Sequence, residues 1–128
     1  MKIKTSELIG TTLDWAVAEC LGLNPRHDMK SHGLKWPGWW VACPEYKRLP
    51  FYSTNWSQGG PLIEREGISL KQNDTNDWNA DMVVLVSPYT STADAVFDYP
   101  QESGPTPLIA AMRCYVTSKI GDTIEVPT

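Results

Sequence analysis

The sequence predicts an α+β fold. We expect a single small domain over residues 1–128, with a mixed or antiparallel sheet of about four to five short strands and two main helices. Two segments repeat apolar residues at the spacing of an amphipathic helix, and several short β-branched or aromatic segments end at glycine, proline or asparagine. A length of 128 residues suits one core better than two.

The first predicted helix lies near the N-terminus. Thr5 or Ser6 is a candidate N-cap, although Gly10 weakens the first turns, and Gly22 occupies the position of a C-terminal cap. Trp15 lies off the apolar face, so it either packs on a neighbouring element or borders a site. The apolar face itself consists of Leu13, Ala16, Val17, Cys20 and Leu21.

The second predicted helix has the strongest signals of any element. Thr106 is a candidate N-cap, Pro107 suits the first helical position and Gly121 ends the helix. Arg113 lies off the centre of the apolar face, where it either contacts a phosphate or carboxylate ligand or pairs with an acid such as Glu64 or Glu66. The face consists of Leu108, Ala111, Met112, Tyr115, Val116 and Ile120.

The predicted strands are short. Residues 82–86 form the most apolar run and are expected to be a buried central strand. The other strands are expected at residues 1–5, 39–42, 68–70 and 124–126. Residues 71–80 are interpreted as a polar turn in which Trp78 is a lid or a stacking surface, and residues 89–104 as a long acidic connection.

Residues 51–68 are the segment most suggestive of a site. Residues 52–56 are expected to be a short strand or a loop, Gly59, Gly60 and Pro61 a sharp reversal, and residues 62–66 one or two helical turns that Gly67 stops. Aromatic, hydroxyl and glycine residues follow one another closely here, which is typical of a binding loop.

Composition excludes several classes of function. A net charge of -4 and a pI near 5.0 argue against binding duplex nucleic acid, since that affinity comes mostly from Lys and Arg. Residues 23–50 are locally basic, which suits either a small anion or a solvated loop. No apolar run reaches the ~18 residues of a membrane span, so we expect no membrane partner. The odd number of widely spaced cysteines makes a disulfide framework unlikely, so we expect a reducing cytoplasm.

Metal and nucleophile chemistry finds little support in the sequence. The three cysteines Cys20, Cys43 and Cys114 are far apart, and His27 and His32 lack the paired spacing of a structural zinc site. We therefore predict no metal, no cofactor and no catalytic residues.

Three blocks of the chain carry a family resemblance. They are LDWAVA at residues 13–18, YST-x-W-x-x-GGP at 52–61 followed by E-x-E-x-I at 64–68, and GPTPLIAAMR at 104–113. Together they resemble the NinX-like family of small phage and prophage proteins. The resemblance implies a phage accessory protein and no particular activity; the family more often has Asp where this chain has Asn55, which would remove a candidate catalytic base.

We predict that such a protein binds and sequesters a nucleotide-derived immune signal, of the cyclic nucleotide or ADP-ribose type, without cleaving it. This activity needs flat aromatic faces, hydroxyls, backbone N–H groups and a positive charge. The predicted ligand-binding residues are Tyr52, Ser53, Thr54, Trp56, Gly59, Gly60, Thr106 and Arg113. The helix start at residues 105–108 is a further source of N–H groups for an anion.

Two alternatives remain open. An inhibitor of a host protein would use an exposed aromatic patch such as Trp36, Trp39 and Trp40, whereas a pocket lined by Trp56 and Arg113 favours sequestration. A signal-degrading phosphodiesterase is the weaker alternative, with only Glu64 and Glu66 as a carboxylate pair. A homo-oligomer, most simply a two-fold dimer, is expected because pairing adds walls to a small pocket.

Overall fold

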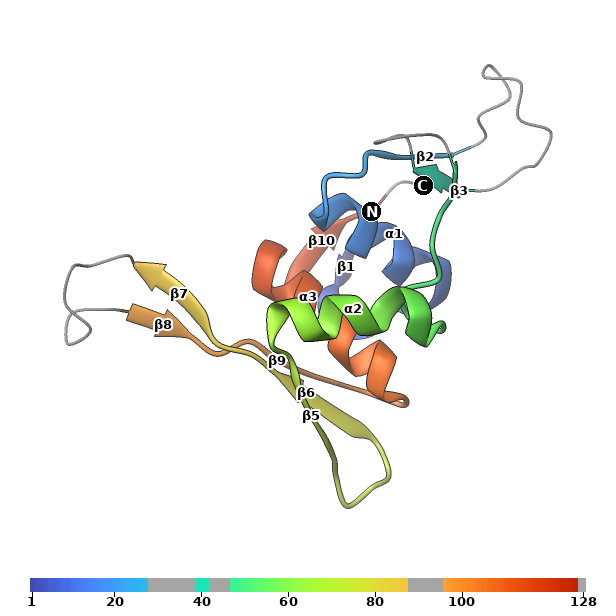
Figure 1. Ribbon diagram of the computed structural model, residues 1–128. Coiled ribbons are helices and arrows are strands. Elements are labelled where there is room, and N and C mark those ends of the chain that lie inside the picture. The colour runs from blue at the N-terminus through green and yellow to red at the C-terminus, as the bar shows by residue number, and fades with distance from the viewer. Residues whose placement is uncertain (28–38, 42–46, 88–95, 127–128) are drawn as a thin grey trace.

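The computed structural model describes residues 1–27, 39–41, 47–87 and 96–126 (Figure 1). Within these ranges it is an α+β structure with three α-helices, one short 3-10 helix and small antiparallel sheets of two and three strands. The helices are α1 (Gly10–Cys20), α2 (Trp56–Glu66) and α3 (Pro107–Ile120). The fold class predicted from the sequence is confirmed.

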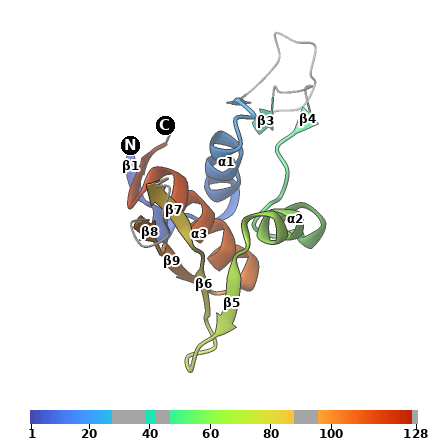
Figure 2. The same cartoon turned by 60° about the vertical axis from the view of Figure 1, so that its left-hand side comes forward.

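Helix α3 lies at the centre of the structure. It packs against α1, against α2 and against the sheet formed by β5, β6 and β9 (Figures 1 and 2). All residues from Leu108 to Val116 are buried except Arg113. A helix that is apolar around most of its circumference needs neighbours on several sides, and α3 has them.

The sheet next to α3 consists of β5 (Ser69–Gln72), β6 (Trp78–Asp81) and β9 (Gln101–Gly104) in that order. Ala80 lies between Leu70 and Glu102 in the antiparallel register. Gly104 allows the close approach to α3, because a Cβ there would lie 2.9 Å from the Ala110 backbone nitrogen. Strand β5 extends beyond the predicted 68–70, and Trp78 begins a strand, so the polar turn predicted for residues 71–80 is shorter than expected.

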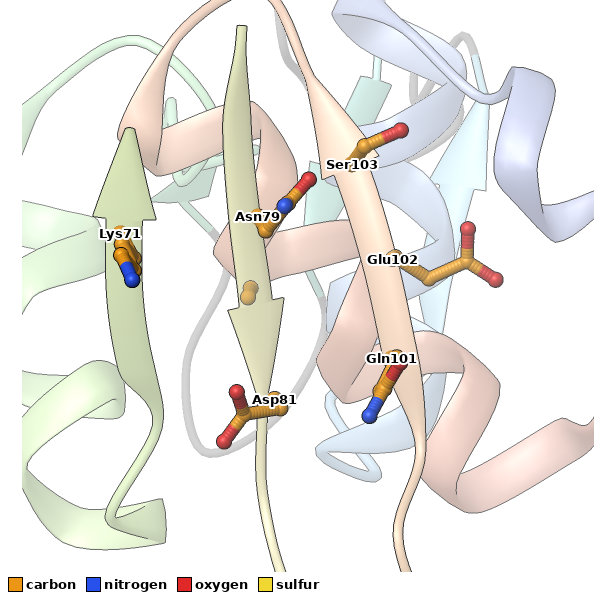
Figure 3. A pocket seen from close by; sticks show the side chains of 7 residues that line it. Lys71, Asn79, Asp81, Gln101, Glu102 and Ser103 are labelled. Carbon is orange, nitrogen blue, oxygen red and sulfur yellow. The ribbon is translucent and has the colours of Figure 1, made fainter. Parts of the chain in front are cut away.

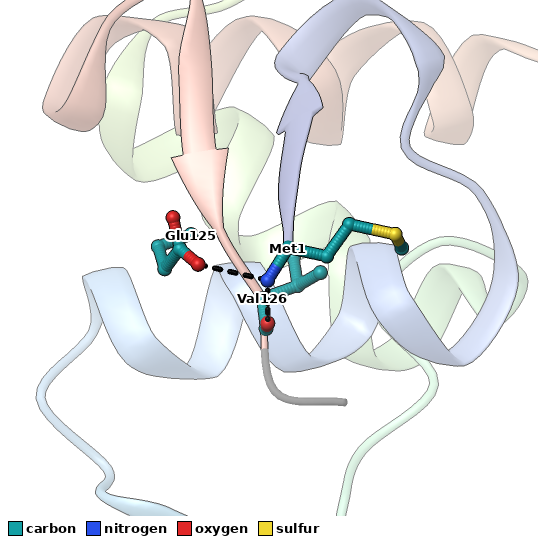
Figure 4. A network of polar contacts seen from close by, with 3 residues as sticks. All are labelled: Met1, Glu125 and Val126. Atoms are coloured by element: carbon teal, nitrogen blue, oxygen red, sulfur yellow. Dashed lines mark hydrogen bonds and ion pairs between the residues drawn. The ribbon is translucent and has the colours of Figure 1, made fainter.

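The two ends of the described chain form a separate sheet. Strand β1 (Lys2–Lys4) pairs antiparallel with β10 (Thr123–Glu125). Both segments were predicted to be strands, but their pairing was not predicted. The Met1 ammonium group donates to a Glu125 carboxylate oxygen at 2.8 Å and to the Val126 carbonyl at 3.2 Å (Figure 4). These contacts close the pair of strands beyond their last register position.

A third sheet contains β2 (Pro25–His27), β3 (Trp39–Val41) and β4 (Lys47–Arg48). Only β3 was expected from the sequence, because β2 and β4 are very short and rich in charge or proline. The other two-stranded sheet, β7 (Val84–Ser87) with β8 (Val96–Asp98), extends away from the helices at the left of Figure 1.

Two predictions about strands are wrong. Residues 82–86 do not form a buried central strand: Val83 is 59% exposed, and among the described residues β7 pairs with β8 alone. Residues 89–104 are not a simple connection, since their described part contains β8 and β9. An apolar run indicates strand character but does not say whether a neighbour covers it.

The sharp reversal predicted at Gly59, Gly60 and Pro61 is also wrong. These residues lie inside α2, which includes the helical turns predicted at residues 62–66 and is a third α-helix beside the two predicted main helices. The helix begins earlier than expected because the Asn55 side chain accepts a hydrogen bond from the Ser57 N–H at 2.9 Å and caps it. Gly67 ends it with φ of 65°, as predicted.

The N-terminal caps of the two predicted helices differ in outcome. Thr106 caps α3 through its hydroxyl, as expected. Thr5 and Ser6 do not cap α1: they lie in the 3-10 helix η1 (Thr5–Glu7), and α1 begins at Gly10 without a side-chain cap. The buried Thr5 hydroxyl instead donates to the Gly121 carbonyl at 3.0 Å.

Candidate functional site

A small pocket lies where the N-terminal ends of α2 and α3 meet. Its volume is about 220 Å³. Four of the eight residues predicted from the sequence line it, and three further residues come from the first turn of α3. The lining consists of Ser53, Thr54, Trp56, Thr106, Pro107, Leu108 and Ile109.

The α2 side of the pocket is built by a tight turn. The Phe51 carbonyl accepts from the Asn55 N–H at 2.8 Å and from the Thr54 N–H at 3.2 Å, and Asn55 then caps the helix. Trp56 is consequently the first residue of α2, and 55% of its surface is exposed. The pocket therefore has an accessible indole among its walls.

The α3 side supplies backbone N–H groups. The Thr106 hydroxyl accepts from the Ile109 N–H at 3.2 Å, and the Thr106 carbonyl accepts from Ala110. Pro107 has no N–H. Leu108 is thus the first residue of α3 whose N–H has no hydrogen-bond partner within the described part of the chain.

Ser53 joins the pocket to the core. Its side chain is only 2% exposed, and its backbone N–H donates to the Asp14 Oδ1 atom at 2.8 Å. Its hydroxyl is buried without a hydrogen-bond partner of regular geometry among the described residues. A buried hydroxyl without a hydrogen bond destabilises the fold unless a ligand or a water molecule supplies the missing partner.

Asp14, on α1, is a functional candidate that the sequence reasoning missed. It is 4% exposed, and burial raises the pKa of its carboxyl group, with the hydroxyl and N–H of nearby Ser53 partly opposing that rise. The available signal was a carboxylate within an otherwise apolar helical run. Its geometry fixes the Ser53 backbone at the edge of the pocket.

Gly59 is where α2 comes closest to its neighbours. A Cβ at this position would lie 2.7 Å from Leu108 Cδ2 and would also meet the Tyr52 carbonyl. A Cβ on Gly60 would meet only the Trp56 ring, at 3.7 Å. Gly59 thus allows α2 to pack closely against Leu108 of the pocket lining, whereas position 60 does not require glycine.

Two predicted ligand residues lie elsewhere. Tyr52 is 8% exposed in the core, where burial and then the nearby Asp14 raise the pKa of its phenol. Arg113 is not among the lining residues: its Nε donates to the Leu8 carbonyl at 2.7 Å and its Nη1 to the Ser103 carbonyl at 2.9 Å. It pairs with neither Glu64 nor Glu66, and it connects three elements of the fold.

A second, larger hollow of about 500 Å³ lies on the β5-β6-β9 sheet (Figure 3). Its lining carries both signs of charge and no aromatic ring. Sequence reasoning missed it because residues 71–80 and 89–104 were not assigned to one sheet. It is lined by Lys71, Asn79, Ala80, Asp81, Gln101, Glu102 and Ser103.

The described residues contain no group of three or more His, Cys, Asp or Glu side chains placed to hold a metal ion. Burial raises the pKa of both Cys20 and Cys114 to about 12, so neither is a thiolate at neutral pH. Cys43 and His32 lie outside the described residues, as does Trp36.

Comparison with known proteins agrees with the resemblance seen in the three sequence blocks. A family model described as Bacteriophage P22, NinX, matches residues 4–119. No curated protein matches the chain. None of the helices in the described ranges is long and apolar enough to cross a membrane. The family match covers both walls of the small pocket.

Proposed function

The chain belongs to the bacteriophage P22 NinX family, and we propose that it is an anti-defence protein that sequesters a nucleotide-derived signal without cleaving it. The host cytoplasm is the compartment in which such a signal would be met. The observation that carries the proposal is the small pocket, whose lining at two helix N-termini includes an accessible indole and the residue whose buried hydroxyl has no regular partner among the described residues.

Each part of a nucleotide has a partner in this arrangement. The Trp56 indole suits a base, since aromatic stacking contributes about 1–3 kcal/mol per base. The Thr54 and Thr106 hydroxyls suit a ribose. The N-terminal turns of α2 and α3 favour an anion, because the helix dipoles make these ends positive and the Leu108 N–H has no hydrogen-bond partner among the described residues.

The volume limits how much of the ligand one chain encloses. Pockets that enclose drug-sized ligands usually have about 300–1,000 Å³, and this one has about 220 Å³. A second copy of the chain across a two-fold axis would supply the missing wall. We therefore propose a dimer whose ligand lies between Trp56 and the partner; the molar mass from light scattering, with and without ligand, tests it.

Trp56 is the pocket residue best placed to stack on a base. Trp56→Ala should weaken nucleotide binding about 5- to 100-fold through lost stacking, while the fold is kept because the side chain is half exposed. The measurement is isothermal titration calorimetry against a panel of cyclic and linear nucleotides and ADP-ribose, after native mass spectrometry has identified masses captured from lysate of infected, defence-active cells.

The matched control is Tyr99→Ala, which removes a similarly exposed aromatic ring outside the pocket. It should leave affinity unchanged. Equal affinity of the Trp56 variant and the unmodified protein would refute the proposal. Release of an altered ligand after incubation would indicate an enzyme, since a sequestering protein returns its ligand intact.

One observation favours the alternative of a host-protein inhibitor. Val83, Phe97 and Tyr99 are exposed on and beside the extended β7–β8 hairpin, where apolar side chains suit protein contacts. The side chains of Trp39 and Trp40 and the whole of Trp36 lie outside what the structure describes, so the patch expected there is not part of this argument. Capture of a host protein that Tyr99→Ala abolishes would support this alternative.

A further inference from the structure

We infer that the pocket selects a phosphodiester, with one negative charge, over a phosphomonoester, with nearly two. This inference rests on the proposed function and deepens it, because it names the class of phosphate group that the nucleotide carries. It depends on which charges and donors surround the pocket.

Two candidate donors come from separate segments of the pocket wall. The Ser53 hydroxyl is almost fully buried and has no hydrogen-bond partner of regular geometry within the described residues. The Leu108 N–H likewise has no hydrogen-bond partner among these residues. Both residues line the same small pocket. A phosphate oxygen there would accept hydrogen bonds from a side chain and from a helix N-terminus together.

The positive charge available at the pocket favours a phosphate group with one negative charge. Each helix N-terminus acts as roughly half a positive charge, so the ends of α2 and α3 together offset about one negative charge. No Lys, Arg or His is among the lining residues that the structure describes. A phosphomonoester carries about -1.5 to -2 charges at pH 7, which this pocket does not neutralise.

Two charged side chains outside the pocket lining act in the same direction. Arg113, the nearest cation on α3 to its first turn, has its Nε and Nη1 committed to the carbonyls of Leu8 and Ser103. Asp14 lies directly behind Ser53, and any negative charge on it repels a dianion more than a monoanion. We assign Asp14 as the positioning residue that orients Ser53, and Ser53 as the residue that contacts the phosphate.

The test separates phosphate class from base identity. Dimethyl phosphate and methyl phosphate are titrated in parallel, followed by 3′,5′-cyclic and 5′-mononucleotides of the same base, with calorimetry and amide chemical shifts of Ser53 and Leu108 as readouts. We expect the diester of each pair to bind at least tenfold more tightly, and Ser53→Ala to lose about tenfold in diester affinity. The control Ser69→Ala, on an exposed strand of the sheet, should change nothing.

The possible outcomes distinguish failure of the phosphodiester assignment from failure of the proposed nucleotide binding. Monoesters that bind as tightly as diesters, with Trp56→Ala still weakening both, would overturn the phosphodiester assignment and leave nucleotide binding in place. Unchanged diester affinity in Ser53→Ala, in a variant that unfolds at the same denaturant concentration as the unmodified protein, would overturn the placement of the phosphate at Ser53. No binding of any nucleotide would overturn both proposals.

Discussion

The small pocket and the sheet hollow differ in whether their lining contains buried polar groups without hydrogen-bond partners among the described residues. The sheet hollow is more than twice as large, at about 500 Å³ against about 220 Å³. Most of its lining side chains, including Lys71 and Asp81, are exposed to water and already solvated. The smaller pocket has a buried hydroxyl without a regular partner within the described residues, and an aromatic wall. Volume alone is therefore a poor guide to a binding site, and unsatisfied polar atoms are a better one.

The largest expected effect is on the support of the small pocket. Gly59→Ala should lower the free energy of unfolding by about 3 kcal/mol, because the new methyl group meets the Leu108 side chain and the Tyr52 carbonyl and forces α2 away from α3. Urea denaturation followed by circular dichroism measures this difference.

Gly60→Ala is the matched control for that change. It makes the same substitution in the same helix but meets only the Trp56 ring at ordinary contact distance. It should be neutral or stabilise by up to about 1 kcal/mol, since Ala is the better helix former. Equal losses in the two variants would show that close packing at Gly59 is not what holds the pocket together.

A smaller effect is expected at Asp14. Asp14→Ala removes the acceptor of the buried Ser53 N–H and should cost about 1–3 kcal/mol. Asp14→Asn keeps an oxygen in place and should cost less at pH 7. Equilibrium unfolding of both variants measures the difference, and a cost as large for Asn as for Ala would contradict the importance of that oxygen.

The pH dependence of this pair follows from the direction of the shift. Burial raises the pKa of Asp14 in the folded protein above its usual value of 3.8, so the ionised carboxylate opposes folding above the folded-state pKa. That penalty is relieved as the pH falls through the folded pKa toward 3.8. Relative to Asp14→Asn, the unmodified protein should gain stability as the pH is lowered from 7 to 4, and a constant difference would contradict the raised pKa.

These comparisons also show what the sequence could reveal. Helix α3 was predictable because Thr106, Pro107 and Gly121 are local signals whose meaning does not depend on the rest of the fold. Helix α2 was predicted only over residues 62–66, because Gly59 and Pro61 suggest a turn when their neighbours are unknown. Gly59 is explained by its close approach to the Tyr52 carbonyl and to Leu108, which is nearly fifty residues away.

The residues of the candidate site also differ in whether local sequence or long-range contacts decide their roles. Ser53, Thr54, Trp56 and Thr106 were found because aromatic and hydroxyl residues cluster in local motifs. Asp14 was missed and Arg113 was placed in the site, because burial and long-range partners decide their roles. Arg113 donates to the carbonyl of Leu8, which is far from it in sequence, and to that of Ser103 on another element, and residue type alone does not reveal these partners.

The smallest effect is expected from a substitution in the sheet hollow. A different result there would reverse the comparison between the two hollows. Lys71→Ala removes the one cation among the described residues that line this hollow. Because the side chain is exposed, stability should change by less than about 0.5 kcal/mol, and affinity for a phosphodiester should not change, since Trp56 and Ser53 lie in the other pocket. Calorimetry of Lys71→Ala beside Trp56→Ala decides between the two hollows. A loss in the lysine variant with none in the tryptophan variant would place the ligand on the sheet, where a solvated ammonium group rather than a buried hydroxyl would then account for binding.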